Sequence, residues 1–153
     1  MKSVLEQSED LCAAFTTLID KDTETFNKVM EAYGLPKDTE GQKALRSAAI
    51  QETTKEAALV PLEVMKHVID ALALVQIVAE KGNANSASDA GVSALMLHAA
   101  CEAAALNVRI NLNTISDHNF NGWKEEELIS LLKTSKAKSD EVLEVVRKKI
   151  AAV

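Results

Sequence analysis

Polar side chains that can bind or protonate a small molecule gather in one stretch of the sequence, from Lys81 to Asp117. A turn of small polar residues opens this stretch, and Asp89 follows where a helix would begin. Near the end of the same helix, Asn107 and Asn111 stand among apolar residues. A carboxylate can transfer a proton, and amide side chains can hold a polar ligand as both donors and acceptors. The stretch is therefore the candidate site.

Helical geometry places Asp89 and Asn107 on one line but far apart. A helix turns about 100° per residue, so Asp89, Asn107 and Asn111 all lie within about 40° of one line. Along the axis, Asp89 and Asn107 are about 27 Å apart. One small ligand cannot contact both within a single helix. Either the two residues serve different places, or an antiparallel copy in a homodimer brings Asn107 of one chain to Asp89 of the other.

Each of these candidates also has a purely structural interpretation. Asp89 suits the start of a helix, where the helix dipole favours negative charge. Asn107 and Asn111 can cross-link helices, because buried amides need hydrogen-bond partners in any case. Lys81 and Arg109 suit solvated surface charges. Both interpretations stay open at the level of residue spacing.

Standard catalytic motifs are not recognisable in the sequence. It has no nucleophile elbow, no phosphate-binding glycine loop and no cluster with metal-ligand spacing. The three histidines are dispersed, and for His98 an exposed contact with Glu102 one turn away is the simpler interpretation. Cys12 and Cys101 are far apart and predict neither a metal site nor a disulfide framework. Catalytic and metal-binding motifs therefore do not indicate a reaction for this sequence.

Composition and charge narrow the class of protein. Of the 153 residues 47% are hydrophobic but only 3% aromatic, and five glycines and two prolines are too few for a fold of many turns. The net charge of −6 argues against a nucleic-acid partner. No apolar run predicts a membrane span, and the acidic N-terminus lacks the apolar core of a signal peptide. We expect one all-α domain over residues 1–153, cytoplasmic, with no nucleic acid and no membrane.

The predicted architecture is a bundle of about five helices with long, partly kinked central helices. Ser3-x-x-Glu6 suggests a capping box for a first helix that ends near Asp20. Asp22 would then cap a short second helix ending at Gly34.

Proline and a second capping box mark the next part of the chain. Thr39-x-x-Gln42 predicts the start of a long third helix. Pro61 inside its periodic pattern predicts a kink or break near Leu59–Val60. The remaining expected boundaries are the end of that helix at Lys81, a fourth helix from Ser86 or Ser88 to about Asn113, and a loop at Thr114–Asn121. This loop leads into a last helical segment with an apolar face formed by Leu128, Leu132, Val142, Val146 and Ile150.

Several short motifs stand in a recognisable order along nearly the whole chain. They are Asp22-x-x-x-Phe26, Leu35-Pro36-Lys37-x-Thr39, Ala49-Ile50-Gln51, Val60-Pro61-Leu62, Lys81-Gly82-Asn83-x-Asn85-Ser86-x-Ser88-Asp89 and Asn107-Val108-Arg109-Ile110-Asn111-Leu112. In this order and spacing, the sequence resembles the formiminotransferase-cyclodeaminase family. The resemblance is to its cyclodeaminase domain and to the related bacterial methenyltetrahydrofolate cyclohydrolases.

This resemblance implies an all-helical fold that dimerises and binds tetrahydrofolate derivatives near the subunit interface. The implied reaction closes 5-formiminotetrahydrofolate to 5,10-methenyltetrahydrofolate with loss of ammonia, or reversibly hydrolyses the methenyl compound to 10-formyltetrahydrofolate. Neither reaction needs a metal, and the folate is the substrate rather than a cofactor.

The resemblance also implies roles for the residues of the candidate stretch. Asp89 would be the carboxylate that transfers the proton. The expected substrate-binding residues are Lys81, Asn83, Asn85, Ser86, Ser88, Asn107, Arg109 and Asn111.

Members of this family begin with a further helical segment that carries a glycine-rich turn, and the sequence starts at Met1, after that point. We therefore expect a cyclodeaminase-like domain that is shorter at its N-terminus than the family, with a separate polypeptide as a candidate source of the segment. The alternative function is a non-catalytic helical homo-oligomer, or one half of a split enzyme.

Overall fold

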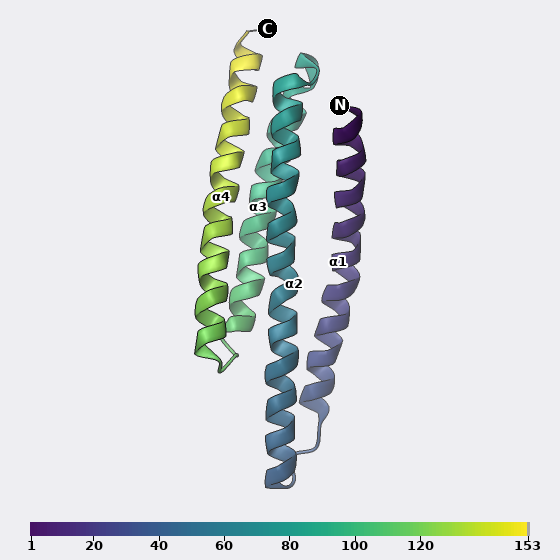
Figure 1. Cartoon of the computed structure of the whole chain (residues 1–153), viewed down its shortest axis with the longest axis vertical. Helices are drawn as coiled ribbons and strands as arrows, with labels where there is room; N and C mark the ends of the chain where they lie inside the picture. Colours follow the sequence, from purple (N-terminus) through teal and green to yellow (C-terminus); the bar gives the residue numbers. More distant parts are fainter. Residues whose placement is uncertain (153) are drawn as a thin grey trace.

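A computed structural model describes residues 1–152 of the protein, which form four long helices joined by short connections (Figure 1). The elements in order are α1 (Lys2–Gly34), α2 (Glu40–Lys81), the short 3-10 helix η1 (Ala84–Ser86), α3 (Ala87–Leu112) and α4 (His118–Ala151). Within residues 1–152 there is no strand. The all-α prediction is confirmed, whereas the expectation of about five helices is wrong because the first two are one.

The first helix, α1, passes through the expected boundary at Asp22 without a break. Asp22 is not a cap: its backbone carbonyl accepts a hydrogen bond of 3.0 Å from the Thr25 hydroxyl, within the helix. At the N-terminus Met1 is the N-cap and makes no side-chain capping bond, so the predicted Ser3 capping box is wrong. The Ser3 hydroxyl instead accepts from Gln7 at 2.9 Å. Packing along α2 outweighs these local capping signals.

The second helix, α2, begins as predicted but does not break. Thr39 Oγ1 accepts from the Gln42 amide at 3.2 Å, and Gln42 Oε1 accepts from the Thr39 amide at 3.0 Å. The helix is 42 residues long and continues through Pro61 without a break. The predicted break near Leu59–Val60 is therefore wrong, and the kink that was the other predicted outcome stays a prediction. Proline removes one hydrogen bond of the helix, and burial of apolar side chains around it compensates.

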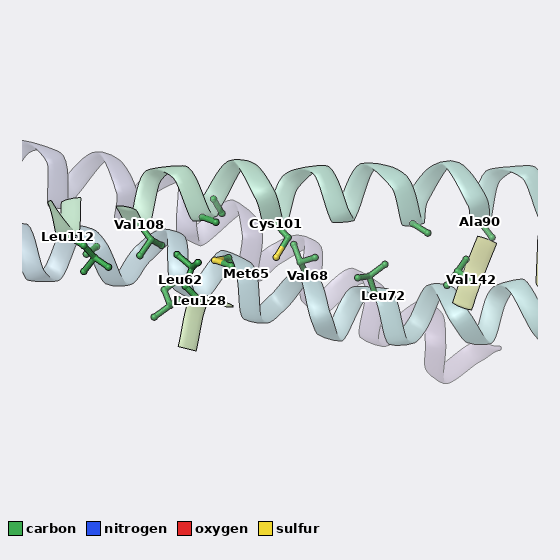
Figure 2. Close-up of a cluster of buried hydrophobic side chains, with 14 of the residues drawn as sticks. Leu62, Met65, Val68, Leu72, Ala90, Cys101, Val108, Leu112, Leu128 and Val142 are labelled. Carbon is green, nitrogen blue, oxygen red and sulfur yellow. The ribbon is translucent and has the colours of Figure 1, made fainter. Parts of the chain in front are cut away.

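The hydrophobic core lies around α2, which packs along each of the other three helices. Figure 2 shows the core side chains that α2 shares with α3 and α4: Leu62, Met65, Val68 and Leu72 from α2, Ala90, Cys101, Val108 and Leu112 from α3, and Leu128 and Val142 from α4. By contrast α1 packs chiefly on α2. As a result α1 and α3 flank α2 with a groove between them.

Small residues let α3 and α4 approach closely. A Cβ on Gly91 would lie 3.2 Å from Val146 Cγ1 of α4, which is tighter than ordinary contact. One turn further, the buried Ser139 hydroxyl donates to the Ala94 carbonyl at 3.2 Å. The alanine content that favoured helices therefore serves close helix packing.

The last helix, α4, begins at His118, inside the loop predicted for residues 114–121, so that loop is shorter than predicted. Asp117 is its N-cap, and its carboxylate accepts from the Phe120 amide at 3.0 Å. The polar stretch at residues 133–140 stays helical. On its inner face two buried serines pack against α3, which explains the low hydrophobicity of that stretch.

One face of α3 is apolar and exposed. Its large side chains are between 53 and 68% exposed: Val92, Leu95, Met96, Leu106 and Ile110. We call this the α3 stripe. With the alanines of the buried face, it makes Ala84–Leu112 the one described stretch that is long and apolar enough to cross a membrane. No such stretch was expected from the sequence, and core helices of soluble proteins can have the same length and apolar composition.

Candidate functional site

A groove runs between α1 and α3, with α2 as its floor. Its main hollow has a volume of about 320 Å³ and is walled by Asp22 of α1 and by Ala103 and Asn107 of α3. Val60 and Pro61 of α2 lie at its base. Small-molecule sites usually occupy a few hundred Å³ and are mainly apolar with a few polar groups, ~300 Å³ being the lower end. This α1/α3 groove has that character.

A second hollow of about 220 Å³ adjoins the first. It is lined by Asp22, Phe26, Ala57 and Asn111, together with Thr25. Asp22 borders both hollows and is the lining residue that they share. The amides that the sequence analysis singled out thus stand one on each side of it.

The Asp22 carboxylate is free for a ligand. It is exposed, and within residues 1–152 no hydrogen bond or ion pair engages its side chain. Asn111 is half-buried and donates from Nδ2 to the Asn107 carbonyl at 3.0 Å, which leaves its own oxygen as an acceptor. A carboxylate and two amides above an apolar floor can hold a polar ring and move a proton.

Sequence reasoning interpreted Asp22 as a helix cap and did not name it as a site residue. No helical periodicity connects it with Asn107 and Asn111, because α1 and α3 meet only in the folded chain. The available signal was the motif Asp22-x-x-x-Phe26, since both of its residues border the second hollow.

The turn between α2 and α3 forms a separate place. Asn83 Oδ1 accepts from the Asn85 amide at 3.0 Å and so shapes the turn. Asn85 and Ser88 border a hollow of about 350 Å³ that also includes Ile150. Ser86 is the N-cap of α3 but makes no side-chain capping bond. These residues lie together at the far end of α3 from Asn107, and their substrate-binding role stays a prediction.

Glycine at the start of this turn is required by close backbone contact. A Cβ on Gly82 would lie 2.4 Å from the Val78 carbonyl oxygen, to which the Gly82 amide already donates at 2.8 Å. Lys81, the last residue of α2, is exposed beside it. Any larger residue at position 82 would thus force the backbone to shift where the turn leaves α2.

Asp89 is exposed in the first turn of α3 and borders neither hollow of the groove. The structure therefore brings Asn107 and Asn111 together with Asp22, and does not bring Asp89 to them within one chain. Its catalytic role stays a prediction that a second chain would have to fulfil.

Arg109 points toward α4 rather than into the groove. Its Nε and Nη2 donate to Glu125 Oε1 at 3.0 and 2.8 Å. This hydrogen bond, before any other cause, raises the pKa of Arg109 above its ordinary value. The predicted contact of Arg109 with a folate carboxylate would have to compete with Glu125 and stays a prediction.

Two other polar residues of α3 belong to its packing against α4. His98 is half-buried rather than exposed, with Nδ1 3.0 Å from the buried Ser135 hydroxyl and Nε2 3.9 Å from Glu102. Burial raises the pKa of the Cys101 thiol. Neither residue borders the groove.

Two side chains of α2 hold the end of α3 that carries the groove amides. Gln51 Nε2 donates to the Thr114 carbonyl at 2.9 Å, and its Oε1 accepts from the Ser116 amide at 2.7 Å. Lys55 pairs with Asp117 at 2.6 Å, and this bond is the main cause that lowers the pKa of Asp117. The α3–α4 connection is therefore fixed to α2 by bonds that span more than sixty residues.

Comparison with known proteins decides the family. A sequence model described as formiminotransferase-cyclodeaminase matches residues 1–130. The chain belongs to the formiminotransferase-cyclodeaminase family. It is 43% identical over 150 residues to a methenyltetrahydrofolate cyclohydrolase of Methylorubrum extorquens, covering 98% of this chain and 72% of that protein.

Longer relatives and a solved structure of the family agree with this assignment. The chain is 33% identical to the formimidoyltransferase-cyclodeaminase of Sus scrofa over 144 residues, which are 94% of this chain and 27% of that protein. It thus spans about a quarter of the length of this relative. The crystal structure of a formiminotetrahydrofolate cyclodeaminase from Thermotoga maritima superposes with a TM-score of 0.85 at 33% identity, covering 98% of this chain and 71% of that one.

Proposed function

We propose that the protein is an enzyme of folate one-carbon chemistry, acting as a formimidoyltetrahydrofolate cyclodeaminase, a methenyltetrahydrofolate cyclohydrolase or both. Relatives with both of these names match nearly its whole length. The observation that carries the proposal is the convergence of Asp22, Asn107 and Asn111 on one groove with an apolar floor. These are the groups that a bound pterin and a proton transfer require.

The proposed chemistry asks one carboxylate to move protons. In the cyclodeaminase reaction, N10 of the folate attacks the carbon of the protonated formimino group and loses its proton, while the departing nitrogen gains that one proton and leaves as ammonia. In the hydrolysis, water adds to the methenyl carbon and loses both of its protons as the formyl carbonyl forms. The bond from that carbon to N5 breaks, N5 gains one of the protons, and the other is released. A carboxylate placed against the reacting carbon can accept and return the proton in either case.

Asp22 is the carboxylate that we assign to this step, since it is free and borders both hollows. Asn107 and Asn111 would hold the polar edges of the substrate, and the side chains of α2 would pack against its ring. Asp89 is the competing candidate. The Asp89 side chain of one subunit would reach only the α1/α3 groove of a partner subunit.

A symmetric homodimer is part of the proposal. The α3 stripe carries exposed apolar side chains along the length of α3, and a second copy could cover it. Antiparallel pairing of two α3 helices would bring the turn at residues 83–89 of one chain toward the Asn107 end of the other. This arrangement would give Lys81, Asn83, Asn85, Ser86 and Ser88 a place at the site.

The test is the absorbance of 5,10-methenyltetrahydrofolate, followed with and without the purified protein, with ammonia release from 5-formiminotetrahydrofolate measured in parallel. We expect turnover in at least one assay. Absence of turnover together with absence of folate binding in calorimetry would favour the alternative, a non-catalytic helical oligomer. Binding without turnover would favour one half of a split enzyme.

A further inference from the structure

Pro61 lies at a place where helix stability alone would exclude proline. It is buried in the middle of the 42-residue helix α2, with regular helix on both sides. Proline in a helix interior is destabilising because it has no N–H to donate to the carbonyl four residues earlier. That carbonyl belongs to Ala57. Pro61 therefore leaves the Ala57 carbonyl without its usual helical donor.

The freed carbonyl is next to the candidate site. Ala57 borders the second hollow together with Asp22 and Asn111, and Pro61 borders the main hollow together with Asp22 and Asn107. Residues four apart share one face of a helix. A helical carbonyl points along the axis toward the residue four positions on. The Ala57 carbonyl thus points from a residue that borders the second hollow toward a residue that borders the main hollow.

Hydrogen-bond acceptors are prominent among the residues that border the two hollows. The Asp22 carboxylate has no partner within residues 1–152, and Asn111 keeps its side-chain oxygen free while its nitrogen binds the Asn107 carbonyl. With the Ala57 carbonyl, three acceptors belong to neighbouring lining residues on three different helices. A ligand edge rich in N–H donors complements them, whereas an edge made only of carbonyl oxygens does not.

We propose that Pro61 is a specificity-determining residue that keeps the Ala57 carbonyl open as a backbone acceptor for an N–H group of the ligand. The proposal rests on the proposed function, because the fused heterocycle of a reduced folate presents such N–H groups. A backbone acceptor fixed by a rigid helix needs no side-chain ordering when the ligand binds. This advantage explains why the helix retains a residue that weakens it.

Two substitutions separate the missing N–H from the proline ring. Pro61→Ala restores the N–H and removes the ring, and Pro61→Val restores the N–H while keeping a similar volume at the floor. The matched control is Gly41→Ala, which improves helix propensity in the same helix at an exposed position with nothing within 4 Å of the new Cβ. The probe is 5-formyltetrahydrofolate, with affinity measured by calorimetry and unfolding temperature by circular dichroism.

Both Pro61 variants are expected to bind the probe about tenfold more weakly, as for the loss of one buried hydrogen bond, with an unchanged or higher unfolding temperature. Gly41→Ala should bind like the wild type. Wild-type affinity in both Pro61 variants would overturn the proposal. A loss in Pro61→Ala that Pro61→Val restores would also overturn it, because the ring and not the missing N–H would then matter.

A wild-type protein that does not bind the probe would instead contradict the proposed function itself. If Pro61→Val fails to fold, Pro61→Ala is compared with Val64→Ala, which removes floor contact without changing a backbone donor. Equal losses of affinity in these two would overturn the proposal.

Discussion

At the scale of single residues, some carboxylates of the molecule form an ion pair with a lysine and others do not. A hydrogen bond from Lys66 lowers the pKa of Glu127, and one from Lys21 lowers the pKa of Glu63. These acids serve to connect helices. Asp22 has no such partner within residues 1–152, although it lies beside two hollows. An unpaired acid in a groove is available for substrate, which is why we assign it to the chemistry.

The pH dependence of stability follows from the paired acids. A carboxylate whose pKa is lowered by folding stabilises the protein above its ordinary pKa of about 4.3, and that stabilisation is lost as the pH falls through the folded value. Lys66→Met should therefore reduce the difference in unfolding free energy between neutral and acidic pH. The reduction is partial because Lys124 also donates to Glu127. Urea unfolding at several pH values measures it.

The control for that experiment is Lys133→Met, which removes an exposed charge that pairs with no acid in the described part of the chain. Its pH profile should parallel the wild type. Parallel profiles for Lys66→Met as well would contradict the role assigned to the ion pair with Glu127.

The groove amides give a prediction for substrate affinity. Asn107→Ala and Asn111→Ala should each raise KM about tenfold, because each removes a hydrogen-bonding group at the edge of a hollow. Unfolding temperature should change little in Asn107→Ala, since that side chain is exposed. Steady-state kinetics with methenyltetrahydrofolate provide the measurement. Wild-type KM in both variants would place the substrate elsewhere.

At the scale of the elements, specific bonds at helix ends decide where each helix stops. Thr39→Ala should lower the unfolding free energy by about 1 kcal/mol, because it removes one half of the capping box of α2. Ser3→Ala is the matched control and should lower the unfolding free energy by at most about a few tenths of a kcal/mol, since Ser3 is not a cap. Equal effects in urea unfolding would mean that the cap of α2 contributes no more than a surface serine.

The connection between α3 and α4 gives a second prediction at this scale. Gln51→Met keeps the length of the side chain but loses both hydrogen bonds to the connection, so we expect a destabilisation of about 1–3 kcal/mol. The control is Gln76→Met, whose amide donates only to Glu80 one turn away in the same helix. Equal stabilities of the two variants would show that the Gln51 bonds do not hold the connection.

At the scale of the whole molecule, the α3 stripe is an apolar face that the single chain leaves uncovered. Leu106 and Ile110 are each about two-thirds exposed. We expect the wild-type protein to sediment as a dimer at micromolar concentration. Leu106→Glu should shift it toward the monomer by placing a charge in the apolar contact, whereas Lys133→Glu should not. A wild-type protein that is monomeric at all concentrations would contradict the dimer.

Short sequence motifs correctly predicted those helix ends that depend only on residues close together in the sequence. The capping box at Thr39 and the turn after Gly82 lie where the sequence placed them. The predicted helix boundary at Asp22 and the predicted break near Pro61 were wrong because packing overrides local preference: α1 continues through Asp22, and α2 continues through Pro61. In both cases long contacts with neighbouring helices outweigh a weak helix former.

The candidate site was predictable only in part, for the same reason. Asn107 and Asn111 stood out because amides are unusual in an apolar helix. Asp22 stood out only through the motif shared with Phe26, because its proximity to the amides depends on how α1 and α3 flank α2. A groove between two helices that are far apart in sequence has no periodic signature.

The measurement that tests the central claim most directly is the rate of methenyltetrahydrofolate hydrolysis in Asp22→Asn and Asp89→Asn. General acid–base catalysis contributes at least about a hundredfold, so Asp22→Asn should lower kcat by that factor or more, with the fold intact by circular dichroism. The kcat of Asp89→Asn should stay within about tenfold of the wild-type value. Substitution of a residue that only contacts the substrate removes about one hydrogen bond. Full activity in Asp22→Asn, with the large loss in Asp89→Asn, would contradict the groove as the place of chemistry.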